Sequence, residues 1–236
     1  ADGGWRIVVI DNADTRNRNA QNAILKILEE PPKNSILIIL AHAPGKLLPT
    51  IKSRCRMLPL KPLKSITVKE ILQKNFPDKE GNVLDGYVAL SNGSPGYAIS
   101  LIEHKGLKLY REMLGLLSTM PNINVPLMHD FAGAITTKKS GDMFLLFSEM
   151  LSQFISRMIR HVSYQGTNHT HNIKEALENE FELMEELGTI IPLDQWADLW
   201  EKISEKMMAT DLLNMDKKQT VIDILNMISS ALKAKK

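Results

Sequence analysis

Cysteine and long hydrophobic runs are nearly missing from this sequence of 236 residues. The single cysteine, Cys55, excludes an intrachain disulfide and any metal site built from several cysteines, and it is typical of a reducing compartment. The densest apolar stretch, Ile36 to Ala41, is far shorter than the roughly 18 residues that a membrane span needs. Charge of one sign is also lacking, because 29 Lys+Arg against 27 Asp+Glu leave a net charge of +2. We therefore predict a soluble intracellular protein without membrane contact that does not coat nucleic acid through overall basic charge.

The first 62 residues predict a strand–helix–strand unit. Arg6 to Ile10 is a β-branched run typical of a strand buried on both faces of a parallel sheet, and Ser35 to Ala41 predicts a second such strand. Between them a helix is expected over residues 19–30, because two prolines follow it. Strands of this kind need neighbours, and the chain begins without methionine, so we expect an N-terminally truncated domain with most of its sheet upstream. The expected apolar face of the helix consists of Ala20, Ala23, Ile24, Ile27 and Leu28.

Beyond residue 62 the pattern is helical. Residues 63–106 predict a small bundle in which Gly93-Ser94-Pro95-Gly96 opens a helix over Tyr97 to His104. Residues 107–236 predict five or six helices, because apolar stripes recur there at the helical period. The clearest stripe runs from Met143 to Val162.

Three features of the helical part are expected to be structural. The six glutamates between residues 175 and 186 are typical of the solvated face of a helix. His169 and His171 have no acidic or cysteine neighbours, so we expect a polar loop and no metal site. Trp196 and Trp200 lie four residues apart on one stripe, which favours a core or a subunit interface.

The order of several motifs near the N-terminus is typical of one protein family. The chain reads VVIDNAD at 8–14, NAQNAILKILEEPP at 19–32, then a predicted strand, then AHAPGKLLPTIKSRC at 41–55. This order resembles the AAA+ clamp-loader family of DNA replication, and within it most closely the delta-prime type of bacterial DNA polymerase III subunit. The resemblance implies an α/β part followed by an all-α part: the C-terminal portion of a RecA-like AAA+ core over 1–62, a helical lid over 63–106, and a helical-bundle collar for oligomerisation over 107–236.

By this resemblance the positions that handle nucleotide in active relatives are degenerate. Asp11, Asn12 and Asp14 fall in the Walker B segment, where Asn12 replaces the glutamate that orients the attacking water, and an amide is no base. Sensor 1 is His42, and Gly96 stands where sensor 2 is an arginine. No G-x-x-x-x-G-K-[ST] loop occurs in the sequence. The resemblance therefore implies a subunit deficient in ATP hydrolysis that binds no nucleotide productively, while ATP and Mg²⁺ occupy the neighbouring subunit.

The SRC motif, Ser53-Arg54-Cys55, retains the family pattern. The resemblance implies that Arg54 is an arginine finger given in trans, because a fixed delocalised cation stabilises charge on a transferring phosphoryl group. Cys55 is expected to pack as a small apolar side chain. The implied partners are gamma/tau and delta subunits and, indirectly, the sliding clamp and primed DNA, within the DNA-directed DNA polymerase holoenzyme of the bacterial cytoplasm. The chain itself would be a stator without catalysis of its own.

Two alternatives remain open. The first is a fragment of an ATP-hydrolysing gamma/tau-type subunit, against which Asn12 and Gly96 count. The second is a stand-alone nucleic-acid binder, because residues 42–69 contain seven Lys or Arg and no acid. For the basic residues other than Arg54, a solvated connector is the favoured interpretation.

Overall fold

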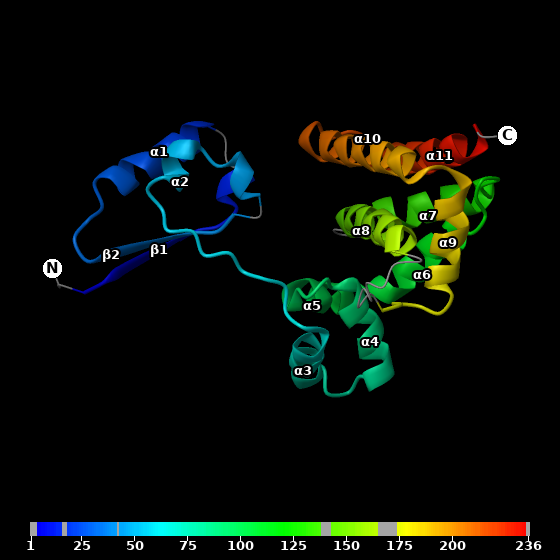
Figure 1. Cartoon of the computed structure of the whole chain (residues 1–236), viewed down its shortest axis with the longest axis horizontal. Helices are drawn as coiled ribbons and strands as arrows, with labels where there is room; N and C mark the ends of the chain where they lie inside the picture. The colour runs from blue at the N-terminus through cyan, green and yellow to red at the C-terminus, as the bar shows by residue number, and fades with distance from the viewer. Residues whose placement is uncertain (1–3, 16–17, 42, 138–142, 165–173, 235–236) are drawn as a thin grey trace. The chain divides into compact units, whose positions relative to one another are not determined.

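Two separate hydrophobic cores divide the chain into units of residues 1–61 and 62–236 in the computed structural model (Figure 1). The structure describes residues 4–15, 18–41, 43–137, 143–164 and 174–234. An α/β segment followed by helices, as the sequence predicts, is confirmed. The finer division into core, lid and collar domains stays a prediction.

The first unit contains the predicted strand–helix–strand arrangement. Strands β1 (Arg6–Ile10) and β2 (Ser35–Ile39) pair in parallel, with Arg6 opposite Ser35 and Ile10 opposite Ile39. Helix α1 (Arg18–Glu29) connects them, and the prolines that follow explain why it ends there. The remaining elements are the short 3₁₀ helices η1 (Ala13–Thr15) and η2 (Pro44–Lys46) and the helix α2 (Pro49–Lys52).

The side chains of β1 are mostly exposed in this chain, and burial of both its faces by neighbouring strands stays a prediction. Ile7 is 63% exposed and Val9 is 58% exposed, because a two-stranded sheet with one connecting helix cannot cover two faces. The expected apolar face of α1 needs correction, since Ala23 and Ile27 are exposed whereas Gln21 is buried. The buried residues that form the core of this unit are Ala13, Ile24, Leu47 and Ile51.

The described residues of the second unit form helices and the turns between them, without a strand, and the expected helix after Ser94 is confirmed. The Ser94 hydroxyl caps this helix by accepting from the Tyr97 backbone N–H. The first three helices are α3 (Ser65–Asn75), α4 (Gly81–Leu90) and α5 (Pro95–Glu103). Six more follow, as the periodicity predicts: α6 (Gly106–Leu117), α7 (Val125–Thr136), α8 (Met143–Tyr164), α9 (Glu180–Ile190), α10 (Leu193–Leu212) and α11 (Lys217–Lys233).

One continuous apolar core connects all nine of these helices, from Val68 to Leu232. At the join between α5 and α6 the packing is close. A Cβ added to Gly106 would lie 2.8 Å from the Leu101 Cδ2 atom and 3.0 Å from the Met150 Cε atom. The predicted boundary between lid and collar at residue 106 therefore crosses a region in which the two parts share their core.

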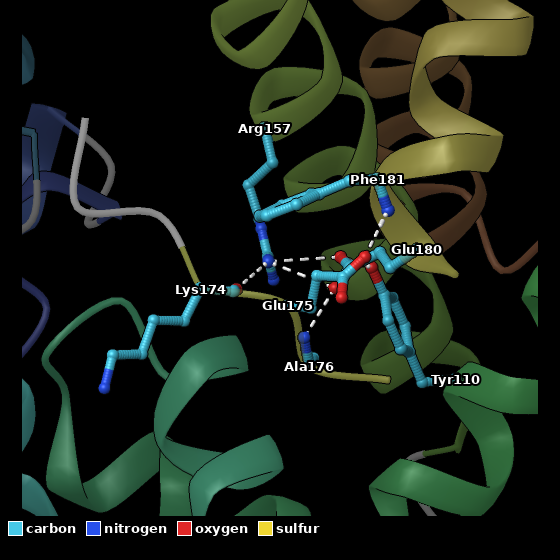
Figure 2. Close-up of polar contacts among 7 residues, drawn as sticks. All are labelled: Tyr110, Arg157, Lys174, Glu175, Ala176, Glu180 and Phe181. Atoms are coloured by element: carbon cyan, nitrogen blue, oxygen red, sulfur yellow. Dashed lines mark hydrogen bonds and ion pairs between the residues drawn. The ribbon is translucent and has the colours of Figure 1, made fainter. Parts of the chain in front are cut away.

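A buried ion pair lies inside this helical unit, and Figure 2 shows its surroundings. The Arg157 guanidinium on α8 is 3.1 Å from the Glu180 carboxylate on α9, and both side chains are at most 2% exposed. The Tyr110 hydroxyl on α6 donates to Glu180 at 2.6 Å, and so does the Ala176 backbone N–H. The Lys174 carbonyl accepts from Arg157 at 2.7 Å. The predicted solvated glutamate face is thus wrong at Glu180, because its partners satisfy a buried carboxylate.

Burial also affects the tyrosine in this cluster. It raises the pKa of the Tyr110 hydroxyl well above its ordinary value, and the negative charge of Glu180 acts in the same direction. Tyr110 therefore keeps the proton that it donates to Glu180. The cluster joins α6, α8 and the start of α9, three segments separated along the chain.

The expectations for the remaining aromatic and histidine residues have mixed outcomes. Trp196 is 1% exposed and donates its indole N–H to the Leu187 carbonyl, so its place in the core is confirmed. Trp200 is 39% exposed and donates to the Ser152 hydroxyl instead. His169 and His171 lie outside the described residues.

Candidate functional site

Asp11 and Asn12 form the turn at the carboxyl end of β1. The exposed Asp11 carboxylate accepts from the Asn12 backbone N–H at 2.9 Å. Asn12 has a φ of 51°, a left-handed conformation that asparagine adopts more readily than most residues. Within the described residues, no group of three or more His, Cys, Asp or Glu could hold a metal ion.

Asp14 has a tertiary contact that the sequence did not predict. It is buried, and its carboxylate accepts from the Ala43 backbone N–H at 2.9 Å. The backbone adds a second connection, because Ala13 N–H donates to the Leu40 carbonyl. The structure thus brings the predicted Walker B segment to the segment after β2. The predicted sensor 1 residue, His42, lies outside the described residues.

Arg54 lies just beyond the end of α2. Its guanidinium Nη2 is 3.0 Å from a carboxylate oxygen of Glu29, at the end of α1, and the side chains are 39% and 52% exposed. Its Nη1 donates to the Thr50 carbonyl at 3.2 Å. The guanidinium therefore has two anchors and remains accessible to solvent.

The position of α2, and with it of Arg54, depends on α1. The Gln21 side-chain oxygen accepts from the Leu48 backbone N–H at 3.0 Å, immediately before Pro49 begins α2. Ile51 on α2 is 1% exposed and belongs to the same core as Ile24 on α1. Gln21 and Glu29 are two helical turns apart at about 3.6 residues per turn, so one face of α1 holds both ends of the α2 segment.

The other two residues of the SRC motif support the turn. The Ser53 hydroxyl donates to the Thr50 carbonyl at 3.0 Å. Cys55 is half-buried against the core of the first unit, which confirms its expected apolar packing. Burial raises the pKa of the Cys55 thiol, so the thiol stays protonated and is a poor nucleophile.

Gly96 belongs to the second unit, in the first turn of α5. It is exposed, and a Cβ added there would meet nothing within 4 Å. The glycine is therefore not required by packing. Space exists for a larger side chain at this position.

The basic segment is partly neutralised by local partners. Arg54 pairs with Glu29, and Lys69 pairs with Asp85 at 2.6 Å. Lys61 and Lys64 are exposed where the chain passes from one unit to the next. None of these observations favours a nucleic-acid surface over a solvated connector.

Glu29 and Gln21 are site residues that the sequence did not predict. Their spacing places both on one face of a helix, but their partners lie 25 and 27 residues further along the chain. The sequence does contain a signal for Gln21. It is a polar residue on the apolar side of the predicted helix, between Ala20 and Ile24.

Known proteins match the part of the chain that contains this site. A family model described as DNA polymerase III, delta subunit, matches residues 1–64. Over 93 residues, 39% of this chain, the sequence is 41% identical to DNA polymerase III subunit delta' of Pseudomonas aeruginosa, of which it covers 28%. The subunit delta' of Escherichia coli is 34% identical over 101 residues, 43% of this chain and 30% of that protein. The resemblance to delta-prime-type clamp-loader subunits is confirmed.

A second group of relatives has a different name. DNA polymerase III subunit gamma/tau of Mycobacterium tuberculosis is 30% identical over 151 residues, 59% of this chain and 25% of that protein. The chain thus spans less than a third of the length of these delta-prime and gamma/tau relatives. No helix in the described ranges is both long and apolar enough to cross a membrane.

Proposed function

We propose that this chain acts as a non-hydrolysing clamp-loader subunit of the delta-prime type and supplies Arg54 to the ATP site of a neighbouring subunit. The observation that carries the proposal is the guanidinium of Arg54, which two local anchors hold at an accessible position in the SRC turn. A guanidinium is always charged, and its planar donors match the oxygens of a phosphoryl group. In a water-excluded subunit interface it would stabilise the negative charge that develops during phosphoryl transfer.

The degenerate positions support a role without hydrolysis by this chain. Asn12 occupies the place of a catalytic glutamate, and its amide cannot accept a proton from water at neutral pH. Gly96 provides no cation where active relatives have a sensor 2 arginine. ATP and Mg²⁺ would therefore be bound by the neighbour, and Arg54 would act there in trans.

The proposed assembly follows from the resemblance. Residues 1–62 would be part of a RecA-like AAA+ core, 63–106 a lid, and 107–236 a collar that joins gamma/tau and delta subunits. The complex would open the sliding clamp and load it on primed DNA in the bacterial cytoplasm, as part of the polymerase holoenzyme. The shared core of α3 to α11 supports a stator, because parts that share a core move together.

The test is Arg54→Ala in a clamp loader reconstituted with gamma/tau and delta subunits. An arginine finger contributes about 10³–10⁵ in rate, so turnover at the site it serves should fall by that order while the complex still assembles. Arg56→Ala is the matched control, because Arg56 is an exposed arginine two residues away. Unchanged ATP hydrolysis by the assembled Arg54→Ala complex would contradict the proposal.

A second candidate is a piece of an ATP-hydrolysing gamma/tau-type subunit. It is favoured by one observation, the 59% of this chain that the mycobacterial gamma/tau match covers. The two candidates differ in an experiment on the full-length protein without partners. ATP hydrolysis by that protein alone would support the gamma/tau type, whereas its absence alongside an effect of Arg54→Ala in the complex would support the delta-prime type.

A further inference from the structure

The end of α1 contacts the proposed finger directly. The Glu29 carboxylate lies 3.0 Å from Nη2 of Arg54, and the Thr50 carbonyl accepts from Nη1 at 3.2 Å. Both anchors belong to elements that are fixed to one another, since Gln21 binds the backbone before α2 and Ile51 is buried in the core that contains Ile24. The finger is therefore held by a rigid frame and not by a loop alone.

The arrangement leaves donors of the guanidinium available. Arginine has five N–H donors in a planar fork. Within the part of the chain that the structure describes, the contacts of this guanidinium are one at Nη1 and one at Nη2. The Nε–H and the second N–H of each terminal nitrogen remain for an anion, so a phosphoryl group can bind without displacing Glu29.

We infer that Glu29 is a positioning residue that holds Arg54 in the orientation needed to contact the neighbour's phosphate. This inference rests on the proposed function. A long side chain loses rotamer freedom when it binds, and one that is already ordered loses less of it. In this chain without its neighbour the pair is exposed, so its contribution is modest there, and water weakens the effect of the Glu29 charge on the arginine.

The main experiment compares Glu29→Ala with Glu30→Ala in the reconstituted complex. Glu30 is the matched control, because it is an exposed carboxylate at the same helix end. An exposed pair of this kind accounts for a factor of about two to five, so Glu29→Ala should lower the turnover number of the assembled complex by that factor. Glu30→Ala should leave it unchanged. Glu29→Gln should recover part of the loss, because its amide oxygen still accepts from a guanidinium.

Two further measurements separate positioning from a general structural effect. In the Arg54→Ala background, Glu29→Ala should cause no additional loss of turnover, because Glu29 acts only through Arg54. Added salt should reduce the difference in turnover number between the Glu29→Ala and wild-type complexes, because salt screens exposed charges. Assembly measured by gel filtration should be the same for all variants.

The outcomes distinguish the two claims. In one outcome, Arg54→Ala lowers ATP hydrolysis by the complex as expected, but the turnover number of Glu29→Ala equals that of the Glu30→Ala control. Only the positioning role is then overturned. A rise in turnover would also overturn it, since Glu29 would then compete with the phosphate. If Arg54→Ala itself has no effect, the proposed function and the positioning role both fail.

Discussion

The two arginine–glutamate pairs in this chain have nearly the same length and very different surroundings. Arg54 and Glu29 are 3.0 Å apart with side chains 39% and 52% exposed, whereas Arg157 and Glu180 are 3.1 Å apart and 2% and 0% exposed. Water screens the first pair and can replace either partner. The second pair has been moved out of water, so each charge depends on the other. The distance between the charges is therefore a poor guide to what a pair does.

The same contrast separates the two units. The first unit has a small core, and its arginine is anchored at the exposed end of α1. The second has an extensive core, and its buried pair connects α6, α8 and the segment before α9. An exposed pair suits a residue that must meet a partner, and a buried pair suits one that holds helices in a single arrangement.

The largest expected effect comes from breaking the buried pair. Arg157→Met leaves an unpaired carboxylate at Glu180 and should lower the free energy of unfolding by about 3–5 kcal/mol, measured by chemical denaturation. Adding Glu180→Leu should recover part of the loss, because no buried charge then remains, although the Tyr110 hydroxyl and the Ala176 N–H lose their acceptor. Arg160→Met on the same helix is the control, since Arg160 is exposed. A loss below about 1 kcal/mol in Arg157→Met would show that water reaches the site.

Tyr110→Phe tests the neutral partner of the same pair. It removes the hydroxyl that donates to Glu180 at 2.6 Å and should cost about 1.5–3 kcal/mol, as hydrogen bonds to charged groups do. In the Arg157→Met/Glu180→Leu background this cost should largely disappear, because the acceptor is gone. An equal cost in both backgrounds would mean that Tyr110 contributes through packing alone.

The smallest expected effect on stability comes from the exposed pair. Glu29→Ala should change the free energy of unfolding by less than about 1 kcal/mol, even though it is expected to alter ATP turnover in the complex. Thermal unfolding at low and high salt, with Glu30→Ala alongside, measures this difference. If Glu29→Ala lowered the free energy of unfolding as much as Arg157→Met, the exposed pair would contribute as much to stability as the buried pair, and the contrast between them would be wrong.

Much of the secondary structure follows from local pattern. The run from Arg6 to Ile10 predicts β1 to the residue, and the helical stripe between Met143 and Val162 falls within α8. Proline and glycine mark helix boundaries, because their effect on the backbone acts within a few residues. An example is the start of α5, where Pro95 follows the capping residue Ser94. The role of Arg54 has a different basis, because it is implied by the resemblance that the SRC motif carries, and it stays a prediction.

The errors concern contacts between distant residues. The glutamate-rich run around Glu180 has the composition of a solvated helix face, but Arg157 lies 23 residues earlier and Tyr110 lies 70 residues earlier. No local period encodes such partners.

By itself, the sequence determined most of the helices and strands and the SRC turn, because residue type and spacing act locally on the backbone. Only the tertiary structure decided which carboxylate holds Arg54 and which glutamate is buried with Arg157. The physical reason is that a charge is stabilised by whatever surrounds it, and packing brings those groups together from distant parts of the chain.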